Sequence, residues 1–257
     1  MAIPRNLFDF AFCHNSNYAP LAALAAEEDW GSENKVLVSY LRHLYGRIAQ
    51  LNAKYEAQGE EDPHLFITED LACFDTGLYT DRYESIYALF VPNTREDAAQ
   101  EWFLKGFYKT SDQALRDIDD LPQRVRFSDD PTDLIYDYRY KIRVNIDHIL
   151  GDEANLERVP ESLRGPENSM LLHRVFEGAV IEAGRRAAAN YMLAVPQYFN
   201  GRIQLLLPLC LTGNEPELAL AIQREDGYYS ARTCLSIDMA YNNARLIARP
   251  EASWICP

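Results

Sequence analysis

Four apolar runs between residues 191 and 237 constrain the fold more than any other part of the sequence. The runs are YMLAVPQYF, GRIQLLLPLCL, ELALAIQRE and YYSARTCLSID, and they are separated by Asn200-Gly201, by TGNEP and by Asp226-Gly227. Asn-Gly and Asp-Gly between strand-like runs are strong hairpin signals, because these residues adopt positive φ with little strain. The sequence therefore predicts an antiparallel meander of about four strands.

The character of the runs also predicts their burial. LLLPLCL and LALAI are almost unbroken in apolar residues, which is typical of central strands that are covered on both faces. YYSARTCLSI alternates between apolar and polar residues, so one of its faces is expected to be wetter. The meander should therefore be the structural centre of the fold.

An N-terminal hairpin layer is predicted ahead of the meander. LFITEDLACFDTGLYT and ESIYALFVPN have strand character, with a tight turn expected at Thr76-Gly77, and residues 103–108 can add another short strand. This layer can be a second sheet or an extension of the first one.

Long helices are expected to pack on these strands. The predicted segments run from Asn17 to about Trp30, from Ser32 to about Tyr55, from Thr132 to Leu150 and from Ser169 to Asn190. The second of them carries a stripe, Leu37 to Tyr55, that favours ordinary core packing and leaves a coiled-coil seam as the alternative. The expected fold class is α+β, a largely antiparallel sheet packed by three to four long helices.

The domain organisation follows from what separates these elements. No Gly/Ser/Pro-rich linker divides the 257 residues, so we expect a single domain over 1–257 or two closely packed lobes. DLPQRVRFSDDP at 120–131 contains two prolines and is the expected boundary if there are two lobes.

Charge and cysteine usage limit the partners and the compartment. Thirty-nine acidic and 25 basic residues give a formal charge of −14, which opposes binding to extended double-stranded nucleic acid but leaves room for a local basic pocket. The five cysteines are an odd number and contain no C-x-x-C, which favours a reduced, cytoplasmic protein without a structural zinc site. No signal-peptide pattern and no apolar run of about 18 residues occurs, so no membrane partner is expected.

Two predicted helices become polar at their C-terminal ends. In the helix from Thr132 to Leu150, Asn145 falls on the apolar stripe and His148 lies three residues further on. In the helix that ends at Asn190, the stripe continues onto Arg186 or Ala187 and then onto Asn190. Each residue also has an ordinary structural explanation, namely local hydrogen bonds for the amides and favourable interaction with the helix dipole for the arginines.

The known phosphate-loop, dinucleotide, hydrolase and zinc-protease motifs do not occur. Clustered carboxylates are scarce, so metal-free chemistry ranks above a two-metal nuclease, and no metal or cofactor is expected. His148 is the preferred acid/base candidate because the pKa of histidine is near neutrality, and Asp238 is the second catalytic candidate. The segment 238–247 favours a short helix over a hairpin. The candidate substrate-binding residues carry amide, phenol or guanidinium groups suited to phosphates and bases: Asn145, Arg158, Arg186, Asn190, Gln197, Gln204, Tyr241, Asn242 and Arg245.

Several long segments resemble the successive blocks of a bacterial family catalogued as domain of unknown function 3825. They are CFDTGLYTDRYESIYALFVPN, NIDHIL, NYMLAVPQYFNGRIQLLLPLCL, PELALAI and DMAYNNARLIARP, and the resemblance covers nearly the whole chain. In that family the first block usually has Asn where this chain has Asp75. Members are often joined to cold-shock-type RNA-binding modules, so the resemblance implies a connection to RNA or nucleotides by association.

Three functions remain open at this point. The first is an enzyme acting on a nucleotide or RNA phosphodiester, with His148 as acid/base and Arg158, Arg186 and Arg245 on the phosphate. The second is a non-catalytic module that binds a nucleotide or RNA, and the third is a protein-interaction domain that uses the stripe from Leu37 to Tyr55. The oligomeric state is left open. For the first two functions we expect Asn145, His148, Arg186 or Arg185, Asn190 and Arg245 to converge on one cleft at an edge of the meander.

Overall fold

The computed structural model describes residues 3–95 and 98–255. The chain divides into two compact units, Met1–Val125 and Arg126–Pro257, and the division falls inside the segment 120–131. Each unit contains a five-stranded sheet and one long helix. None of the described helices is both long enough and apolar enough to cross a lipid bilayer.

The N-terminal unit has the strand order β1-β5-β4-β3-β2. Its strands are β1 Ala11–Phe12, β2 Phe66–Ile67, β3 Ala72–Tyr79, β4 Ser85–Pro92 and β5 Trp102–Lys109, and its helices are α1 Leu7–Phe10, α2 Tyr18–Leu24 and α3 Lys35–Gln58. All neighbouring strands are antiparallel except β1 and β5, which run parallel. The first predicted helix is therefore shorter than expected, whereas the second is present as α3.

One face of this sheet packs against α3. The stripe residues Leu37, Leu41, Leu44 and Ile48 are all buried, and the ring of Tyr45 lies 5.9 Å from the ring of Phe74 in β3. The stripe is therefore part of the core of its own unit and is not a free coiled-coil seam. The opposite face is covered by residues 113–121, where Leu115 and Ile118 pack on Cys73, Tyr87 and Leu89.

The tight turn predicted at Thr76-Gly77 is wrong, because both residues lie inside β3. The register between β3 and β4 shifts between Asp75 and Tyr79, and Gly77 has φ +68°. A Cβ at Gly77 would lie 2.6 Å from the hydroxyl oxygen of Tyr40, so the position requires glycine for two reasons. A glycine inside a strand-like run marks a bulge here rather than a chain reversal.

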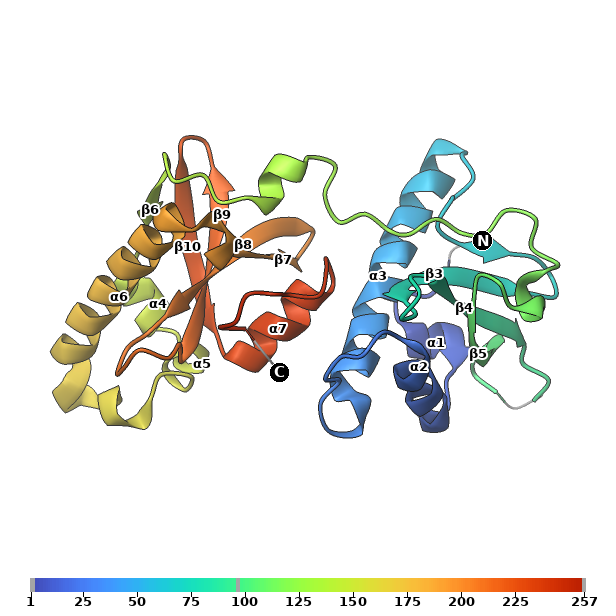
Figure 1. Cartoon of the computed structure of the whole chain (residues 1–257), viewed down its shortest axis with the longest axis horizontal. Coiled ribbons are helices and arrows are strands. Elements are labelled where there is room, and N and C mark those ends of the chain that lie inside the picture. The colour runs from blue at the N-terminus through green and yellow to red at the C-terminus, as the bar shows by residue number, and fades with distance from the viewer. Residues whose placement is uncertain (1–2, 96–97, 256–257) are drawn as a thin grey trace. The chain divides into compact units, whose positions relative to one another are not determined.

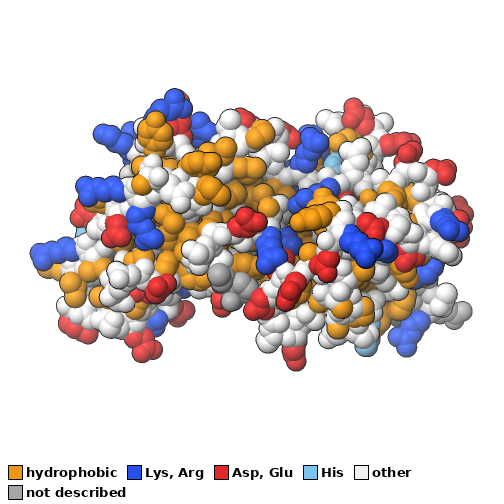
Figure 2. Space-filling view, viewed as in Figure 1, with side chains coloured by type: hydrophobic (Ala, Val, Ile, Leu, Met, Phe, Trp, Pro, Cys, Tyr) orange, Lys and Arg blue, Asp and Glu red, His pale blue; other side chains and the backbone are white. Residues whose placement is uncertain are grey.

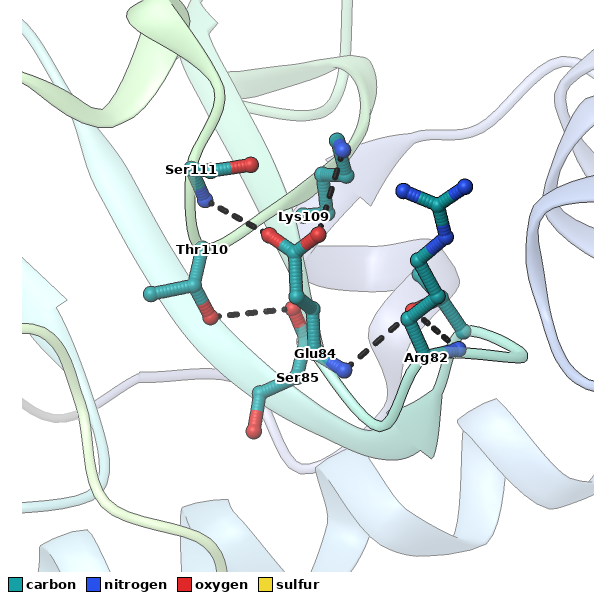
Figure 3. Close-up of polar contacts among 7 residues, drawn as sticks. Arg82, Glu84, Ser85, Lys109, Thr110 and Ser111 are labelled. Atoms are coloured by element: carbon teal, nitrogen blue, oxygen red, sulfur yellow. Dashed lines mark hydrogen bonds and ion pairs between the residues drawn. The ribbon is translucent and has the colours of Figure 1, made fainter.

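The chain reverses five residues later, between β3 and β4 (Figure 3). One carboxylate oxygen of Glu84 lies 3.1 Å from Lys109 Nζ and the other accepts the Ser111 backbone N–H at 3.2 Å. The contacts with Ser111 and Lys109 lower the pKa of Glu84. This cluster ties the turn to the end of β5.

The C-terminal unit has the strand order β6-β10-β9-β8-β7. Its strands are β6 Lys141–Arg143, β7 Val195–Phe199, β8 Arg202–Leu209, β9 Leu218–Glu225 and β10 Tyr228–Leu235, and its helices are α4 Ile146–Leu150, α5 Glu153–Leu156, α6 Ser169–Ala189 and α7 Ile237–Arg245. The meander prediction is confirmed, including the Asn200-Gly201 turn, where both residues have positive φ. The sheets are mixed rather than purely antiparallel, because β6 and β10 are parallel.

Helices cover both faces of this second sheet (Figure 1). The helix α6 packs through Phe176 and Ala183 on one face, where it meets Leu205, Leu207 and other alternate residues of β8 and β9. The helix α7 lies on the other face, in contact with β7, β9 and β10. The expected burial of β8 and β9 on both sides is therefore confirmed.

The predicted helix from Thr132 to Leu150 is wrong. The segment contains a short 3₁₀ turn at Pro131–Leu134, the strand β6 and the short helix α4. Lys141 and Arg143 pair with Tyr228 and Ser230 of β10, which is far away in the sequence. A long-range strand pairing therefore overrides the helical spacing of Ile135, Tyr138 and Ile142.

Candidate functional site

The residues expected to converge lie on two faces of the C-terminal sheet. The helix α4, which carries His148, packs with α6 through Ile146 and Ile149. Arg245 belongs to α7 on the opposite face. The prediction of one shared cleft for His148 and Arg245 is therefore wrong.

The two catalytic candidates belong to different helices. His148 is exposed on α4, and its backbone N–H donates to Asn145 Oδ1 at 3.1 Å. Asn145 is the N-cap of this helix and is itself exposed, so the expected inward position is also wrong. Asp238 is exposed in the first turn of α7. His148 and Asp238 therefore lie on two different helices, α4 and α7.

Arg158 links two elements of the unit. Its Nη1 donates to Asn155 Oδ1 at 2.8 Å and to the Cys234 carbonyl oxygen at 2.7 Å. Thr233 Oγ1 donates to the same Asn155 oxygen at 2.7 Å. Sequence reasoning missed the buried Asn155, which joins α5 to β10, because nothing in its local pattern marks it.

Arg186 also has protein partners. Its Nη1 lies 3.4 Å from Cys210 Sγ and 3.9 Å from a carboxylate oxygen of Glu182 one helical turn earlier. Arg185 is exposed on the same helix. These contacts suit the end of α6, where cations interact favourably with the helix dipole.

Gln197 and Gln204 form a buried amide network on the α7 face of the sheet. They are opposite each other on β7 and β8, and Gln197 Nε2 donates to Gln204 Oε1 at 2.8 Å. Asn243 Nδ2 of α7 donates to Gln197 Oε1 at 3.0 Å. Buried amides cost free energy unless they are paired, and this chain of bonds fixes α7 on β7.

Two of the predicted residues of α7 face inward as well. Tyr241 and Arg245 are buried, with Arg245 only 7% exposed, and Ser236 rather than Asp238 caps the helix. Asn242 Nδ2 donates to the Asp238 carbonyl oxygen at 2.9 Å. The helix preference for 238–247 is confirmed, and its polar residues mainly stabilise the packing of that helix.

A groove of about 590 Å³ lies beside this network. Its walls are formed by residues 190–196, by residues 248–254 and by Leu134, Ile135 and Ala244. Trp254 Nε1 donates to the Leu193 carbonyl oxygen at 2.9 Å, and this hydrogen bond joins the two walls. Figure 2 shows hydrophobic side chains gathered on the surface of this unit.

The groove combines apolar surface with a few polar groups. Tyr191 is 58% exposed and Ile135 is 51% exposed, so both present apolar surface to solvent. Asn190 lies at the end of α6, where its Oδ1 accepts the Met192 N–H, and Arg249 is exposed on the other wall. Of the predicted site residues, Asn190 is the one that lines this groove, and sequence reasoning missed Tyr191, Arg249 and Trp254.

The strand β3 of the N-terminal unit carries a buried carboxyl group, Asp75. Asp75 accepts the Gly77 N–H at 2.7 Å. Burial raises the pKa of Asp75 to about 6, although the Gly77 hydrogen bond and the charge of Arg124 both lower it. Burial also raises the pKa of the nearby Cys73 thiol to about 12, as it does for Cys234, so these two thiols are not activated nucleophiles. Cys256 lies outside the described residues.

Among the described residues, no three His, Cys, Asp or Glu side chains are grouped so that they could hold a metal ion. The candidate site is therefore the groove and the amide network behind it. Two of the segments on which the sequence resemblance rests meet here, because NYMLAVPQYF begins at Asn190 and DMAYNNARLIARP ends at Pro250.

Comparison with known proteins agrees with that resemblance. No curated protein and no solved structure matches the chain. A family model described as domain of unknown function (DUF3825) matches residues 21–254, which is nearly the whole chain. The chain belongs to the DUF3825 family.

Proposed function

We propose that this chain is a non-catalytic module that binds a nucleotide, or an unpaired nucleotide of an RNA, in the groove between residues 190–196 and 248–254. The observation that carries the proposal is the lining, which places the exposed ring of Tyr191 near an amide and a guanidinium. Aromatic rings stack on bases, amides hydrogen-bond base edges, and guanidinium groups contact phosphate oxygens.

The size and charge of the site favour a short ligand. A groove of about 590 Å³ is within the usual range for small-molecule sites. Residues 126–257 carry 14 Lys or Arg against 18 Asp or Glu, and 13 of those 14 cations are arginine. An acidic unit repels a long phosphate backbone, so one or two nucleotides held locally fit it better than a duplex.

Binding is favoured over catalysis because of where the acid/base candidates lie. Neither His148 nor Asp238 lines the groove, and no described carboxylate other than Glu251 does. A general acid or base must come within hydrogen-bond reach of the proton that it transfers. The groove supplies recognition groups and lacks the histidine on which the enzymatic alternative depends.

The test measures fluorescence anisotropy of labelled single-stranded RNA octamers, the matching duplex and competing free nucleotides. Single-stranded RNA or nucleotides should bind and the duplex should not. Tyr191→Ala should weaken binding by about tenfold or more, because a base stack contributes about 1–3 kcal/mol. Arg249→Ala should weaken binding for all sequences and reduce the salt dependence.

Two matched variants serve as controls. Tyr83→Ala removes a tyrosine that is 84% exposed in the other unit, and Arg174→Ala removes an exposed arginine of α6. Neither should change the affinity. Binding that survives Tyr191→Ala unchanged would contradict the site, and RNA turnover that disappears in His148→Ala would restore the enzymatic function.

A further inference from the structure

A second groove, of about 900 Å³, lies in the N-terminal unit. It is lined by Asn52 near the end of α3, by residues of the loop 61–67 and by residues of the segment 117–123. The Gln123 N–H donates to the Pro63 carbonyl oxygen at 2.7 Å, so a backbone hydrogen bond joins two of its walls. The groove is therefore formed by the fold and is not a gap between loose ends.

The lining carries charge of one sign. Its acidic residues are Glu61, Asp62, Asp117, Asp119 and Asp120, and none of the described residues that line it is Lys, Arg or His. A concave surface with charge of one sign raises the local concentration of ligands of the opposite sign. This surface therefore attracts cations.

Two buried oxygen atoms point to the kind of cation. Asp62 has a side chain that is 4% exposed, and its Oδ1 accepts the His64 backbone N–H and lies 2.9 Å from His64 Nδ1. The other oxygen, Oδ2, and Asn52 Oδ1 are buried without a hydrogen-bond partner among the described residues. A buried acceptor without a donor costs about 1–3 kcal/mol, so both atoms favour a ligand that brings N–H groups.

The spacing of the carboxylates disfavours a single metal ion. No three acidic, histidine or cysteine side chains of the described chain come together around one point. Charges spread along a groove match a cation whose positive groups are also spread out. The lining residues Leu65, Phe66 and Leu121 can cover the methylene groups between such charges.

We propose that the groove around Asn52 and Asp62 binds an organic cation, with ammonium or guanidinium groups spaced along a methylene chain. Two sources share this chemistry, a free polyamine and the basic side chains of a peptide. In either case, the exposed carboxylates of the lining hold the positive charge, and N–H donors of the ligand pair with Asp62 Oδ2 and Asn52 Oδ1 when these side chains turn toward the groove.

Titration calorimetry of the full chain tests the proposal with spermidine, with a short Lys/Arg peptide and with magnesium chloride. Spermidine or the peptide should bind, and the tighter of the two identifies the source. Asp62→Asn, which keeps the shape and removes the charge, should weaken binding at least tenfold. Asn52→Ala should weaken it by a smaller factor.

Asp70→Asn is the matched control, because Asp70 is an exposed carboxylate of the same unit that does not line the groove. It should leave the affinity unchanged. Asp119→Asn and Asp120→Asn remove exposed carboxylates and provide the test if Asp62→Asn does not fold. The proposal is overturned if neither organic cation binds, or if Asp70→Asn weakens binding as much as the groove variants. It is also overturned if magnesium displaces both organic cations when the total concentration of positive charge is the same for magnesium and for the organic cation.

Discussion

The two units of this chain repeat one order of strands and differ in how the sheet is covered. In each unit a short strand is followed by a long helix and a four-stranded antiparallel meander, and the last strand of the meander returns to lie parallel to the first strand. Thus β1, α3 and β2 to β5 correspond to β6, α6 and β7 to β10. The strand order is therefore the same in both units, and the units differ in what covers each sheet.

The correspondence extends to one turn. Glu84 directly precedes β4, and Glu217 directly precedes the equivalent strand β9. Glu84 accepts the backbone N–H of Ser111, which follows β5, at 3.2 Å, whereas Glu217 accepts the N–H groups of Leu211 at 2.7 Å and Thr212 at 2.9 Å within its own turn. The equivalent carboxylates therefore have different roles: Glu84 ties its turn to the end of β5, and Glu217 fixes the turn in which it lies.

The second face of each sheet is where the units diverge. In the first unit an irregular segment with Leu115 and Ile118 covers it, and in the second unit the helix α7 covers it through the Gln197 network. The charge differs as well, with 11 Lys or Arg against 21 Asp or Glu in residues 1–125. The first unit is therefore strongly acidic, whereas the second is closer to neutral and has the groove that Tyr191 lines.

The prediction with the largest expected effect tests whether the two units unfold independently of each other. Phe176→Ala should destabilise the C-terminal unit by about 3–5 kcal/mol, because it leaves a cavity under α6. Hydrogen exchange measured by mass spectrometry should increase over 126–257 and not over 1–125. Leu44→Ala should do the reverse, and increased exchange in both units from either variant would show that they unfold together.

The next effect concerns the buried carboxyl group of Asp75 in the first unit. Because the folded pKa of Asp75 is raised to about 6, the unfolded chain ionises first, and the wild type loses stability as the pH rises from about 4 to about 6. Asp75→Asn should remove this loss and stabilise the protein by up to about 3 kcal/mol at pH 7. Urea unfolding at pH 4 and pH 7 measures it, and a variant less stable than the wild type at pH 7 would show that the charge of Asp75 is needed.

The third effect concerns the amide network of the second unit. Gln204→Leu leaves Gln197 Nε2 without its acceptor and should destabilise the protein by about 1–3 kcal/mol. A double-mutant cycle with Gln197→Leu should show a clear coupling energy in urea unfolding. Additive effects of the two substitutions would mean that the pair does not act as a unit.

The smallest effect concerns the cap of α4. Asn145→Ala should cost about 1 kcal/mol, because the His148 N–H loses its partner. His148→Ala leaves the capping bond in place and serves as the control in the same thermal unfolding experiment. An equal loss in both variants would argue against capping as the role of Asn145.

The sequence predicted those parts of the fold that depend on residues close together in the chain. The meander could be read from Asn200-Gly201 and Asp226-Gly227, and α3 and α6 from their apolar stripes, because short-range turn and helix signals coincide there with burial. The strands β1 and β6 could not be predicted, since they contain two and three residues and exist only by pairing with β5 and β10. The register shift after Asp75 cannot be told from a turn in the sequence, because glycine is typical of both structures.

The candidate site was predictable only in part. Gln197, Gln204 and Asn190 stood out because polar residues interrupt apolar runs at those positions, and two of them are buried in one network. The wall made by Arg249 and Trp254 depends on where the chain goes after α7, which no periodicity reports. The acid/base chemistry of His148 can be inferred from the sequence, but its position on α4, outside the lining of the groove, cannot.

The parallel strand pair of each unit has a consequence for protein synthesis. Ala11 pairs with Trp102 and Lys141 pairs with Tyr228, so each sheet closes only after its last strand has been made. At about 5–20 residues per second the ribosome needs roughly 5–20 seconds for such a stretch, whereas helices and hairpins form within microseconds. During that interval the first strand of each sheet, β1 or β6, has no partner, because the last strand of the sheet has not yet been made. The first unit can complete its sheet before β7 of the second has been translated, so its strands can pair with one another while the second sheet does not yet exist.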